Sequence, residues 1–426
     1  MPVNGGPGAA GPTSRQEPSV PTVNGSAPSA AAGIADVVCL GESMVTFRPA
    51  QGQSGGLGAV ESFDRGIGGA ESNVACTLAR AGHATRWVSR VGADGFGGHL
   101  VEEIASWGVD TSAVRRDPDR PTGIYFRTAG ERSTGTERET EAAAATDTGP
   151  ESRPGADPDD TPRGEVAYYR AGSAASAMSR ENTDPAALAD TRVLHLSGIT
   201  AALSADCLAL LRHLTAPRPD RPLVSFDVNY RMHLWPDAGT AGRTLLELAR
   251  GSDLVFVGED EAEAAWGVTG GPAAVRAALP EPRRLVVKQG ASGATLFERP
   301  ESADAQSEST RTGADTVTHQ PAPTVDVVAA VGAGDAFAAG FLSATLRDLP
   351  AAQRLRHGHL MAAAALTVPG DLARPYDRET ADRLTALPDD AWATLRIGAG
   401  RVTGRGVAGA AGAAGDAGQS VEVVTA

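Results

Sequence analysis

Cysteine and aromatic residues are scarce in this chain of 426 residues. It has three cysteines, and aromatic residues make up 4% of it. Cys39, Cys76 and Cys207 are odd in number, widely spaced and set among apolar residues, which predicts reduced thiols in a cytoplasmic protein rather than disulfides or a metal site. No stretch approaches the roughly 18 apolar residues of a membrane span, and residues 1–33 lack the unbroken apolar stretch of a signal peptide.

Positive charge is also in short supply. Lys and Arg total 38 against 52 Asp and Glu, which gives a formal net charge of −14. The resulting field repels nucleic acid, so a small molecule is the expected partner. A Walker-type P-loop, with its Lys followed by Ser or Thr, is absent from the sequence.

Composition separates a central domain from two ends. Residues 1–34 are rich in Gly, Pro, Ala and Ser, and residues 403–426 are mostly Gly and Ala, so both are expected to be disordered. Between them, residues 35–402 alternate short apolar runs with helical spacing. This alternation predicts an α/β fold with a doubly wound, mostly parallel sheet flanked by helices. The expected strands are 37–40, 86–91, 193–196, 223–226, 254–257 and 285–287.

Two stretches interrupt the alternation. Residues 122–128 and 165–170 alternate like strands and have no helix between them, which indicates a hairpin that projects from the main sheet. Residues 130–164 contain no Val, Ile, Leu, Met or aromatic residue and are expected to form a flexible acidic insertion. The polar residues 299–323 are interpreted as a second flexible insertion.

The most informative motif is Gly332-Ala333-Gly334-Asp335, which follows a β-branched run and precedes an Ala-rich apolar stretch. A strand, an anion-binding turn and a helix are predicted, with backbone amides and the helix dipole directed at a phosphoryl group. Asp335 is placed to accept the proton of an attacking hydroxyl. The alternative is a turn with a helix cap.

Four further motifs carry polar groups at expected strand ends or turns. The paired Gly68 and Gly69 before Asn73 favour a small polar ligand, with an Asn-capped loop as the alternative. The segment 227–231 lies at the carboxyl end of a strand, where open α/β sheets bind ligands. The segment 168–173 places Arg170 beside phenolic hydroxyls, which suits a carboxylated, hydroxylated substrate, with a solvated edge strand as the alternative. Residues 288–293 form either a nucleotide-binding turn or a plain β-turn.

These segments, in this order, resemble the PfkB, or ribokinase-like, family of sugar kinases over residues 37–371. Within the family the chain is most similar to 2-keto-3-deoxygluconate kinases. The residues that carry this resemblance are Gly41-Glu42, Gly69-Ala70-Glu71-Ser72-Asn73, the segments 168–174 and 196–199, and 227–231 with Leu234-Trp235.

The resemblance implies a kinase domain with a small β-sheet lid, whose strands lie near 45–66 and 121–171, and often a homodimer formed through that lid. It also implies a role for each matching residue. Catalysis falls to Asp335 as the base, with the amides of Gly332, Ala333 and Gly334 as the anion hole. The implied sugar-side residues are Gly68, Gly69, Asn73, Tyr125, Tyr169, Arg170, Arg231 and Asp335. The implied ATP-side residues are Asn229, Lys288, Gly290, Gly293, Gly332 and Gly334.

The metal positions depart in part from the family pattern. Glu261 matches a glutamate that organises Mg²⁺ through water, but Gly258 occupies the position of the motif's Asn. Ala329 stands where the family has an Asp that helps to bind a monovalent cation, and Asp326 lies three residues upstream. This departure calls potassium activation, and with it full turnover, into question.

Three functions follow. The first is transfer of the γ-phosphoryl group of Mg-ATP to the primary hydroxyl of 2-keto-3-deoxygluconate, with Arg170 and Arg231 holding the carboxylate. The second keeps the chemistry but takes fructose or another neutral sugar. The third is a kinase-like sensor of sugar or nucleotide with little catalysis, suggested by Ala329 and the two insertions.

Overall fold

The computed structural model describes Met1 and residues 34–51, 53, 55–128, 165–219, 221–300, 314–407 and 421–422. Residues 2–33 and the acidic insertion 130–164 lie outside the described residues, so the expectations for them stay predictions. The same holds for residues 301–313 and for most of the C-terminal tail. The described residues from Ile34 onward belong to one compact unit.

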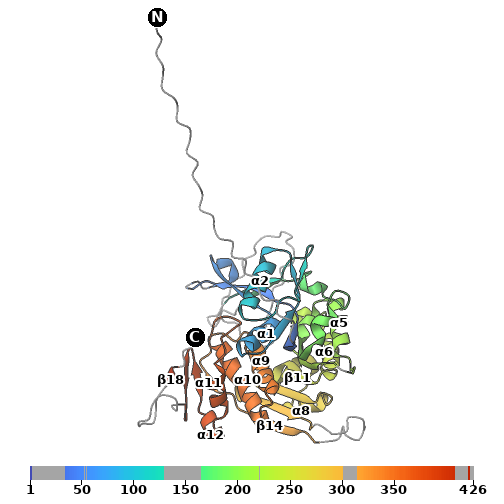
Figure 1. Cartoon of the computed structure of the whole chain (residues 1–426). Coiled ribbons are helices and arrows are strands. Elements are labelled where there is room, and N and C mark those ends of the chain that lie inside the picture. The colour runs from blue at the N-terminus through green and yellow to red at the C-terminus, as the bar shows by residue number, and fades with distance from the viewer. Residues whose placement is uncertain are drawn as a thin grey trace, which may run out of the picture. The chain divides into compact units, whose positions relative to one another are not determined.

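An eight-stranded sheet forms the centre of the fold (Figure 1). Six of its strands are parallel, and two antiparallel strands extend one edge. Their order across the sheet is β14 (Thr316–Gln320), β13 (Ala294–Glu298), β12 (Arg284–Lys288), β11 (Leu254–Gly258), β10 (Leu223–Asp227), β9 (Thr191–Ser197), β1 (Ala35–Leu40) and β4 (Thr85–Val88). The direction of winding reverses at β1, so the predicted doubly wound, mostly parallel sheet is confirmed.

Helices cover both faces of this sheet because alternate residues of its buried strands are apolar on either side. On β10, Val224 and Phe226 face one core, while Val193 on β9 faces the other. The first core packs against α4 (Gly198–Ala202), α5 (Ala205–Thr215), α6 (Ala238–Arg250), α7 (Glu259–Trp266) and α8 (Pro272–Ala278). The second packs against α1 (Ala70–Arg80), α2 (Gly95–Ser106), α9 (Ala333–Leu346) and α10 (Ala351–Leu366).

The remaining helices are short. They are α3 (Pro185–Ala189), α11 (Arg378–Thr385) and α12 (Asp389–Trp392), with 3₁₀ turns at Leu57–Ala59, Ala175–Ala177, Met232–Leu234 and Gly290–Ser292. Within the described part of the chain, no helix is long and apolar enough to cross a membrane.

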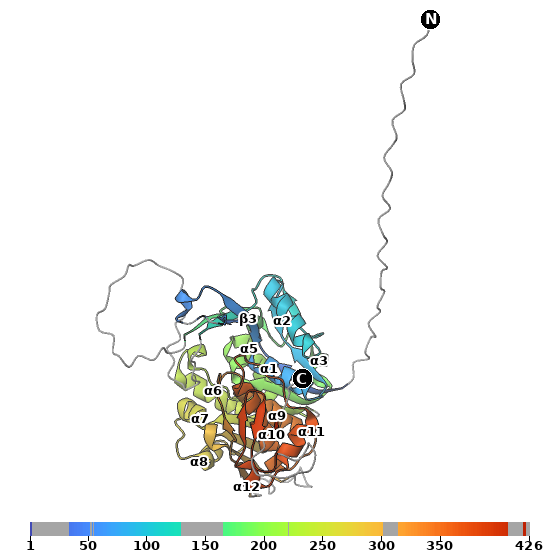
Figure 2. The ribbon, with the colours of Figure 1, turned by 90° about the vertical axis from the view of Figure 1, so that its left-hand side faces the viewer.

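A separate four-stranded sheet lies above the body of the domain, near α2 (Figure 2). Its strand order is β3 (Phe63–Gly68), β2 (Met44–Pro49), β7 (Ile124–Arg127) and β8 (Val166–Tyr169). These strands fall within the segments 45–66 and 121–171, apart from one or two residues at the ends of β2 and β3. We call them the upper sheet.

Two further small sheets complete the structure. One pairs β5 (Arg90–Gly92) with β6 (Arg115–Asp117). The other joins β15 (Thr324–Val325), β16 (Arg396–Gly398), β17 (Arg401–Thr403) and β18 (Val421–Glu422).

Three expectations need correction. The second flexible insertion, 299–323, is wrong in its C-terminal part, because residues 316–320 form β14 and pair with β13 along the whole strand. The disordered tail does not begin at 403, because Val407 is buried in a core cluster with Val402. The strand expected before the catalytic turn is reduced to β15, and Val327 and Val328 that follow it are exposed. In the first two places pairing or packing with residues distant in sequence decided the outcome.

Candidate active site

The Gly332–Asp335 turn begins helix α9. Gly332 is the N-cap residue and has φ +74°, a left-handed conformation that favours glycine. A Cβ added there would lie 2.2 Å from the backbone oxygen of Asp371, so the turn is also pressed against that segment. Ala333, Gly334 and Asp335 occupy the first turn, where helix amides lack intrahelical acceptors and the helix dipole is positive. This end of α9 can therefore hold a phosphoryl group.

Asp335 is half-buried and accepts a hydrogen bond from the side chain of Asn73 on α1, with 2.9 Å between Nδ2 and Oδ2. Burial, with a smaller contribution from the charge of Asp227, raises the pKa of Asp335 to about 7, although the bond from Asn73 and the cation of Lys288 lower it. A carboxylate with a pKa near neutrality can accept a proton and release it again.

Lys288 lies next to this turn. Its Nζ is 3.1 and 3.2 Å from the two carboxylate oxygens of Asp227, and a Cβ added at Gly334 would lie 3.6 Å from it. Burial alone would lower the pKa of Lys288, but the charges of Asp227 and Glu261 outweigh it and raise that pKa. The ammonium group therefore stays charged at the carboxyl ends of β12 and β10, beside the helix end that can bind an anion.

Arg231 and Glu261 border the same region. Arg231 is partly exposed; its Nη1 donates to the carbonyl oxygen of Tyr230 at 2.9 Å and lies 3.9 Å from Oε1 of Glu261. Oε2 of Glu261 accepts from the backbone N–H of Gly258 at 2.6 Å. The described residues contain no cluster of three side chains that could hold a metal ion. Glu261 and Asp227 fit an Mg²⁺ that arrives with nucleotide phosphates, because Mg²⁺ at such sites takes only one or two carboxylates.

The upper sheet closes the other side of the site. Tyr125 on β7 donates from its hydroxyl to Oδ1 of Asp371 at 3.1 Å, and Oδ2 of Asp371 lies 3.6 Å from Nη2 of Arg127. A Cβ added at Gly68 would lie 2.8 Å from the Tyr125 hydroxyl. Asp371 therefore contacts the upper sheet with its side chain and packs against Gly332 with its backbone. Gly69 is the N-cap residue of α1, and a Cβ added there would lie 2.3 Å from the backbone oxygen of Glu42.

Arg170 was expected to bind a substrate carboxylate, but in the structure it pairs with Glu42. The guanidinium Nη2 contacts Oε2 of Glu42, and the hydroxyl of Ser173 donates to Oε1 at 2.6 Å. Glu42 is 3% exposed and the Arg170 side chain 10%, so the pair is largely withdrawn from water. Arg231 is therefore the more available cation for a ligand.

Tyr169 is placed differently from the sequence prediction. It pairs with Ile124 in the upper sheet, is 52% exposed and packs edge-on against Phe126. Its neighbour Tyr168 pairs with Tyr125 and so shares the face that carries Tyr125. The ring of Tyr168 also lies below the Arg170 guanidinium, at 5.9 Å. Tyr168, rather than Tyr169, faces the site.

The other predicted ATP-side residues lie at or beyond strand ends of the main sheet. Asn229 follows β10, is 7% exposed and has φ +40°. Gly290 begins a 3₁₀ turn after β12, and Gly293 ends it. A Cβ at Gly293 would lie 2.2 Å from the backbone oxygen of Gln320. Close packing against that strand therefore explains a glycine at this position without any bound nucleotide.

Sequence reasoning missed Glu42 and Asp371 as site residues. Tyr168 and Asp227 lay within the predicted motifs 168–173 and 227–231, but neither was given a role of its own. Asp371 gave no local signal, since its contacts with Tyr125 span 246 positions.

A second buried carboxyl lies two residues before Asn73. Glu71 is completely buried, and its Oε1 accepts from the Ser197 backbone and hydroxyl and from the Thr200 hydroxyl, at 3.1, 2.8 and 2.7 Å. Burial raises the pKa of Glu71 to about 7 although those hydrogen bonds lower it. These bonds attach the helix that carries Asn73 to the end of β9.

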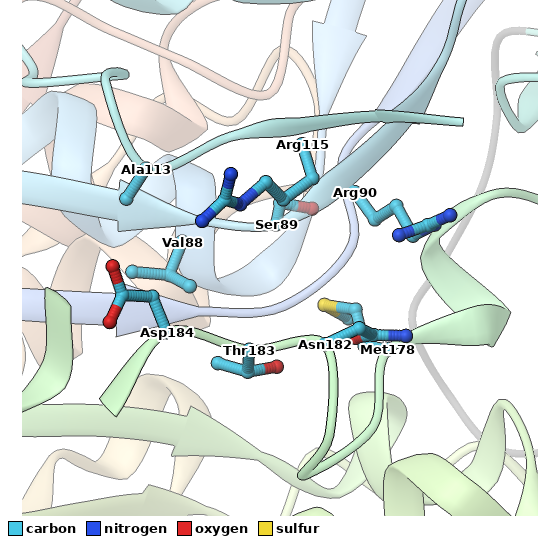
Figure 3. Close-up of a pocket in the computed structure, with 9 residues that line it drawn as sticks. All are labelled: Val88, Ser89, Arg90, Ala113, Arg115, Met178, Asn182, Thr183 and Asp184. Carbon is cyan, nitrogen blue, oxygen red and sulfur yellow. The ribbon is translucent and has the colours of Figure 1, made fainter. Parts of the chain in front are cut away.

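The hollow in Figure 3 is separate from these residues. It lies between β4, β6 and the segment before α3, includes Ser89, Arg115 and Thr183, and has a volume of about 10 Å³. That is room for about one water molecule.

Comparison with known proteins finds related sequences and structures. A family model described as "pfkB family carbohydrate kinase" matches residues 34–153 and 160–376. The chain is 32% identical over 340 residues to a 2-dehydro-3-deoxygluconokinase of Bacillus subtilis (strain 168), which covers 79% of this chain and 91% of that protein. It is 29% identical over 354 residues to a 2-dehydro-3-deoxygluconokinase of Thermoproteus tenax, covering 82% and 94%. The crystal structure of a PfkB protein from Polaromonas sp. JS666 is similar, with a TM-score of 0.61, 31% identity and coverage of 80% and 98%.

Proposed function

Because the chain belongs to the pfkB family of carbohydrate kinases, which transfer a phosphoryl group from ATP to a sugar, we propose that its acceptor is 2-keto-3-deoxygluconate. The product would be 2-keto-3-deoxy-6-phosphogluconate, with ADP released. The observation that carries the phosphoryl-transfer part of the proposal is the convergence of Asn73, Asp335 and Lys288 at the first turn of α9. It supplies a base, an anion-binding helix end and a cation at one point.

In the proposed mechanism, Asp335 accepts the proton of the sugar's primary hydroxyl while that oxygen forms a bond to the γ-phosphorus. The bond between this phosphorus and the β–γ bridging oxygen breaks, and ADP leaves with the electron pair. The amides of Gly332, Ala333 and Gly334 stabilise the charge on the phosphoryl oxygens, and Lys288 adds a positive charge beside them. Glu261 and Asp227 would hold an Mg²⁺ that arrives with the phosphates, and that ion would supply further positive charge.

The acid sugar is supported by Arg231. Its side chain is partly exposed, and the nearest carboxylate oxygen, on Glu261, is 3.9 Å away. The charge of Arg231 also lowers the pKa of Asp335. A partly exposed cation close enough to act on the base is suited to receive a substrate carboxylate.

A neutral sugar is the second candidate, and the Arg170–Glu42 pair favours it. Because Glu42 already compensates the charge of Arg170, this arginine could bind a substrate carboxylate only if Glu42 were displaced. Arg231→Ala separates the candidates, because its loss should raise the KM of an acid sugar strongly and the KM of fructose little.

The first experiment is ADP release by the full-length protein with Mg-ATP and 2-keto-3-deoxygluconate, fructose or ribose in parallel. A preference for the acid sugar supports the proposal, and a preference for fructose moves it to the second candidate. Asp335→Asn should lower kcat by about 10²–10⁴-fold while sugar binding persists. Retention of most activity in that variant would refute the assigned base, and turnover with none of the sugars would favour the sensor hypothesis.

We also propose that the upper sheet acts as a lid and as the interface of a homodimer. Phe47 stacks on Phe126 with 4.7 Å between ring centroids, Phe63 packs edge-on against Phe126, and Tyr169 lies exposed at the end of this row. An exposed aromatic at the edge of such a row suits an interface. Light scattering of Tyr169→Asp against the unchanged protein tests this, with loss of the dimer as the expected result.

A further inference from the structure

Lys288 is the one lysine in the whole sequence. Lys and Arg together total 38 residues, and 37 of them are arginines. Arginine is therefore the ordinary cation of this protein, also in buried ion pairs such as that of Arg170 with Glu42. The two cations are not interchangeable, because a guanidinium is a planar fork with five donors and an ammonium is a compact charge with three donors that rotate. A single lysine beside the catalytic turn indicates a task that needs an ammonium group.

The end of β11 separates Lys288 from its partner. Asp227 ends β10 and Lys288 ends β12, and β11 lies between these two strands. The register pairs Asp227 with Phe256 and Lys288 with Gly258, so these residues share one face of the sheet. Phe256 packs edge-on against Phe341, with 5.4 Å between ring centroids, which places α9 on that face. The lysine side chain therefore crosses the end of β11 on the side of the helix whose first turn can bind a phosphoryl group.

The ion pair of Lys288 with Asp227 is long. Nζ lies 3.2 Å from Oδ1 and 3.1 Å from Oδ2, whereas bonds between charged N–H donors and carboxylates are usually about 2.7–2.9 Å long. The Asp227 side chain is 3% exposed and the Lys288 side chain 20%. Asp227 also has a short side chain, whereas Lys288 has a flexible stem of four carbons. The carboxylate is therefore the fixed partner, and the ammonium is the group that can move toward another anion.

A second position for an anion borders the ammonium group. A Cβ added at Gly334 would lie 3.6 Å from Nζ of Lys288. Gly334 belongs to the first turn of α9, where the backbone amides lack intrahelical acceptors. A phosphoryl group held by those amides would be within reach of Lys288 after a small movement of its side chain. Asp227 and the phosphoryl group therefore compete for one ammonium group.

Asp335 is a third anion close to Lys288. The charge of Lys288 lowers the pKa of Asp335, and the charge of Asp335 raises the pKa of Lys288. A direct ion pair between the two would stabilise the carboxylate and so weaken it as a base. Asp227 opposes that pairing, because it binds the ammonium group at the ends of β10 and β12.

The metal that accompanies ATP bears on the same pair. Asp227 and Glu261 fit an Mg²⁺ bound to nucleotide phosphates, and Mg²⁺ takes carboxylate oxygens as ligands. A carboxylate that faces a divalent ion attracts Lys288 less strongly than a carboxylate without one. Loading of the site therefore weakens the hold of Asp227 on Lys288 at the moment when a phosphoryl group becomes available to it.

We propose that Lys288 exchanges partners when the site is loaded. In the free protein Asp227 holds the ammonium group and keeps it from Asp335, and in the loaded protein the ammonium group binds the phosphoryl group that is transferred. Asp227 is then a positioning residue, and Lys288 contacts the reacting group. An arginine cannot make this exchange, because its fork binds both oxygens of a carboxylate at once. The proposal rests on phosphoryl transfer from ATP and not on which sugar accepts the group.

The single lysine makes a direct test possible. Full-length protein that contains lysine isotope-labelled at Cε has one lysine signal in its NMR spectrum, which Lys288→Met identifies by removing it. We expect this signal to move when Mg²⁺ and a non-hydrolysable ATP analogue are added, and to move less with Mg²⁺ and ADP, which lacks the γ-phosphoryl group. An unmoved signal, while calorimetry shows that the analogue binds, would overturn the exchange. Equal movement with ADP would overturn contact with the transferred group.

Asp227→Asn tests the positioning role in the free protein. Without the carboxylate, the lysine signal should differ from that of the unchanged protein before any ligand is added. A signal at the same place in both proteins would show that Asp227 does not hold the ammonium group, and would overturn this part of the proposal. Because these spectra need no turnover, inactivity toward every sugar would refute the proposed acceptor without deciding the exchange.

Lys288→Arg tests the need for an ammonium group, since it keeps the charge. We expect kcat to fall at least about tenfold while sugar binding persists and the unfolding temperature is unchanged. The matched control is Arg212→Lys, the reverse substitution at an arginine that is 48% exposed and paired with Glu247, which should leave kcat unchanged. A wild-type kcat in Lys288→Arg would overturn the need for lysine. If that variant unfolds, the spectra of the unchanged protein decide.

Discussion

Lowering the pH from 8 to 6 should remove most of the kinase activity, because it protonates Asp335. Burial raises the pKa of this carboxyl to about 7. Roughly nine-tenths of the protein then carries the carboxylate at pH 8 and roughly one-tenth at pH 6. A base that must be deprotonated to act makes kcat/KM for the sugar fall by the same ratio.

The neighbours of Asp335 predict the direction in which each variant shifts this pH profile. Asn73→Ala removes a hydrogen bond that stabilises the carboxylate, at 2.9 Å, and should move the limb up by about one pH unit. Lys288→Met removes a stabilising cation and should move it the same way. Asp227→Asn removes a repelling charge and leaves Lys288 unpaired, so it should move the limb down.

The assay is direct measurement of ADP at several sugar concentrations between pH 5.5 and 8.5, with Mg-ATP saturating. Titration of ATP itself is the main confounder, but it is identical for every variant, so only the differences between variants count. A kcat/KM that stays constant from pH 6 to 8 would refute the assignment of Asp335. So would a shift in the same direction for Asn73→Ala and Asp227→Asn.

Three further predictions concern other residues of the site. The pKa of Glu71 is raised from 4.5 to about 7, so the folded state binds this proton more tightly than the unfolded state and stability falls as the pH rises through that range. Glu71→Gln should therefore remove about 3 kcal/mol of the difference in unfolding free energy between pH 5 and pH 8. Denaturant titration measures this difference, with the exposed Glu247→Gln as control. Gly332→Ala should destabilise the fold by about 1–3 kcal/mol and abolish turnover, because the added Cβ would lie 2.2 Å from a backbone oxygen. The control Gly334→Ala should fold normally, and equal unfolding temperatures for the two variants would contradict the predicted strain at Gly332. Replacing Na⁺ by K⁺ should not raise kcat, because Ala329 offers no carboxylate and Asp326 lies toward Gly398; several-fold activation by K⁺ would show that the cation binds without that carboxylate.

The main sheet could be predicted from the sequence because its strands are short, apolar and separated by helices. Each strand from β9 to β12 lies within a residue or two of its expected range at its C-terminal end. The failures came where the signal was not local. β14 reads Thr-Val-Thr-His-Gln, and only Val317 is apolar, so its place beside β13 was set by pairing rather than by composition.

The candidate site shows the same division. Asp335, Gly332 and Asn73 lie together as the motifs predict, because each sits at a helix start whose position follows from its strand. Which face a strand residue occupies was not predictable, since a shift of one position reverses every side chain. The sequence therefore predicts Tyr169 as the site residue, whereas in the structure Tyr168 shares the face of Tyr125.

Pairing of charges across the upper sheet limits how a substrate carboxylate can bind. Arg170 reaches Glu42, and Arg127 lies 3.6 Å from Asp371, so each arginine of this region that is withdrawn from water already faces a carboxylate of the main body. Removing one partner of such a pair costs more than the pair contributes, because it leaves a buried charge alone. A sugar acid therefore gains most by adding its carboxylate to the partly exposed Arg231, without displacing Glu42. Arg231→Ala should therefore raise the KM of the acid sugar more than Arg170→Ala does, whereas Arg170→Ala should lower the unfolding free energy more than Arg231→Ala does. The opposite ranking in both KM and stability would show that Glu42 releases Arg170 to the substrate.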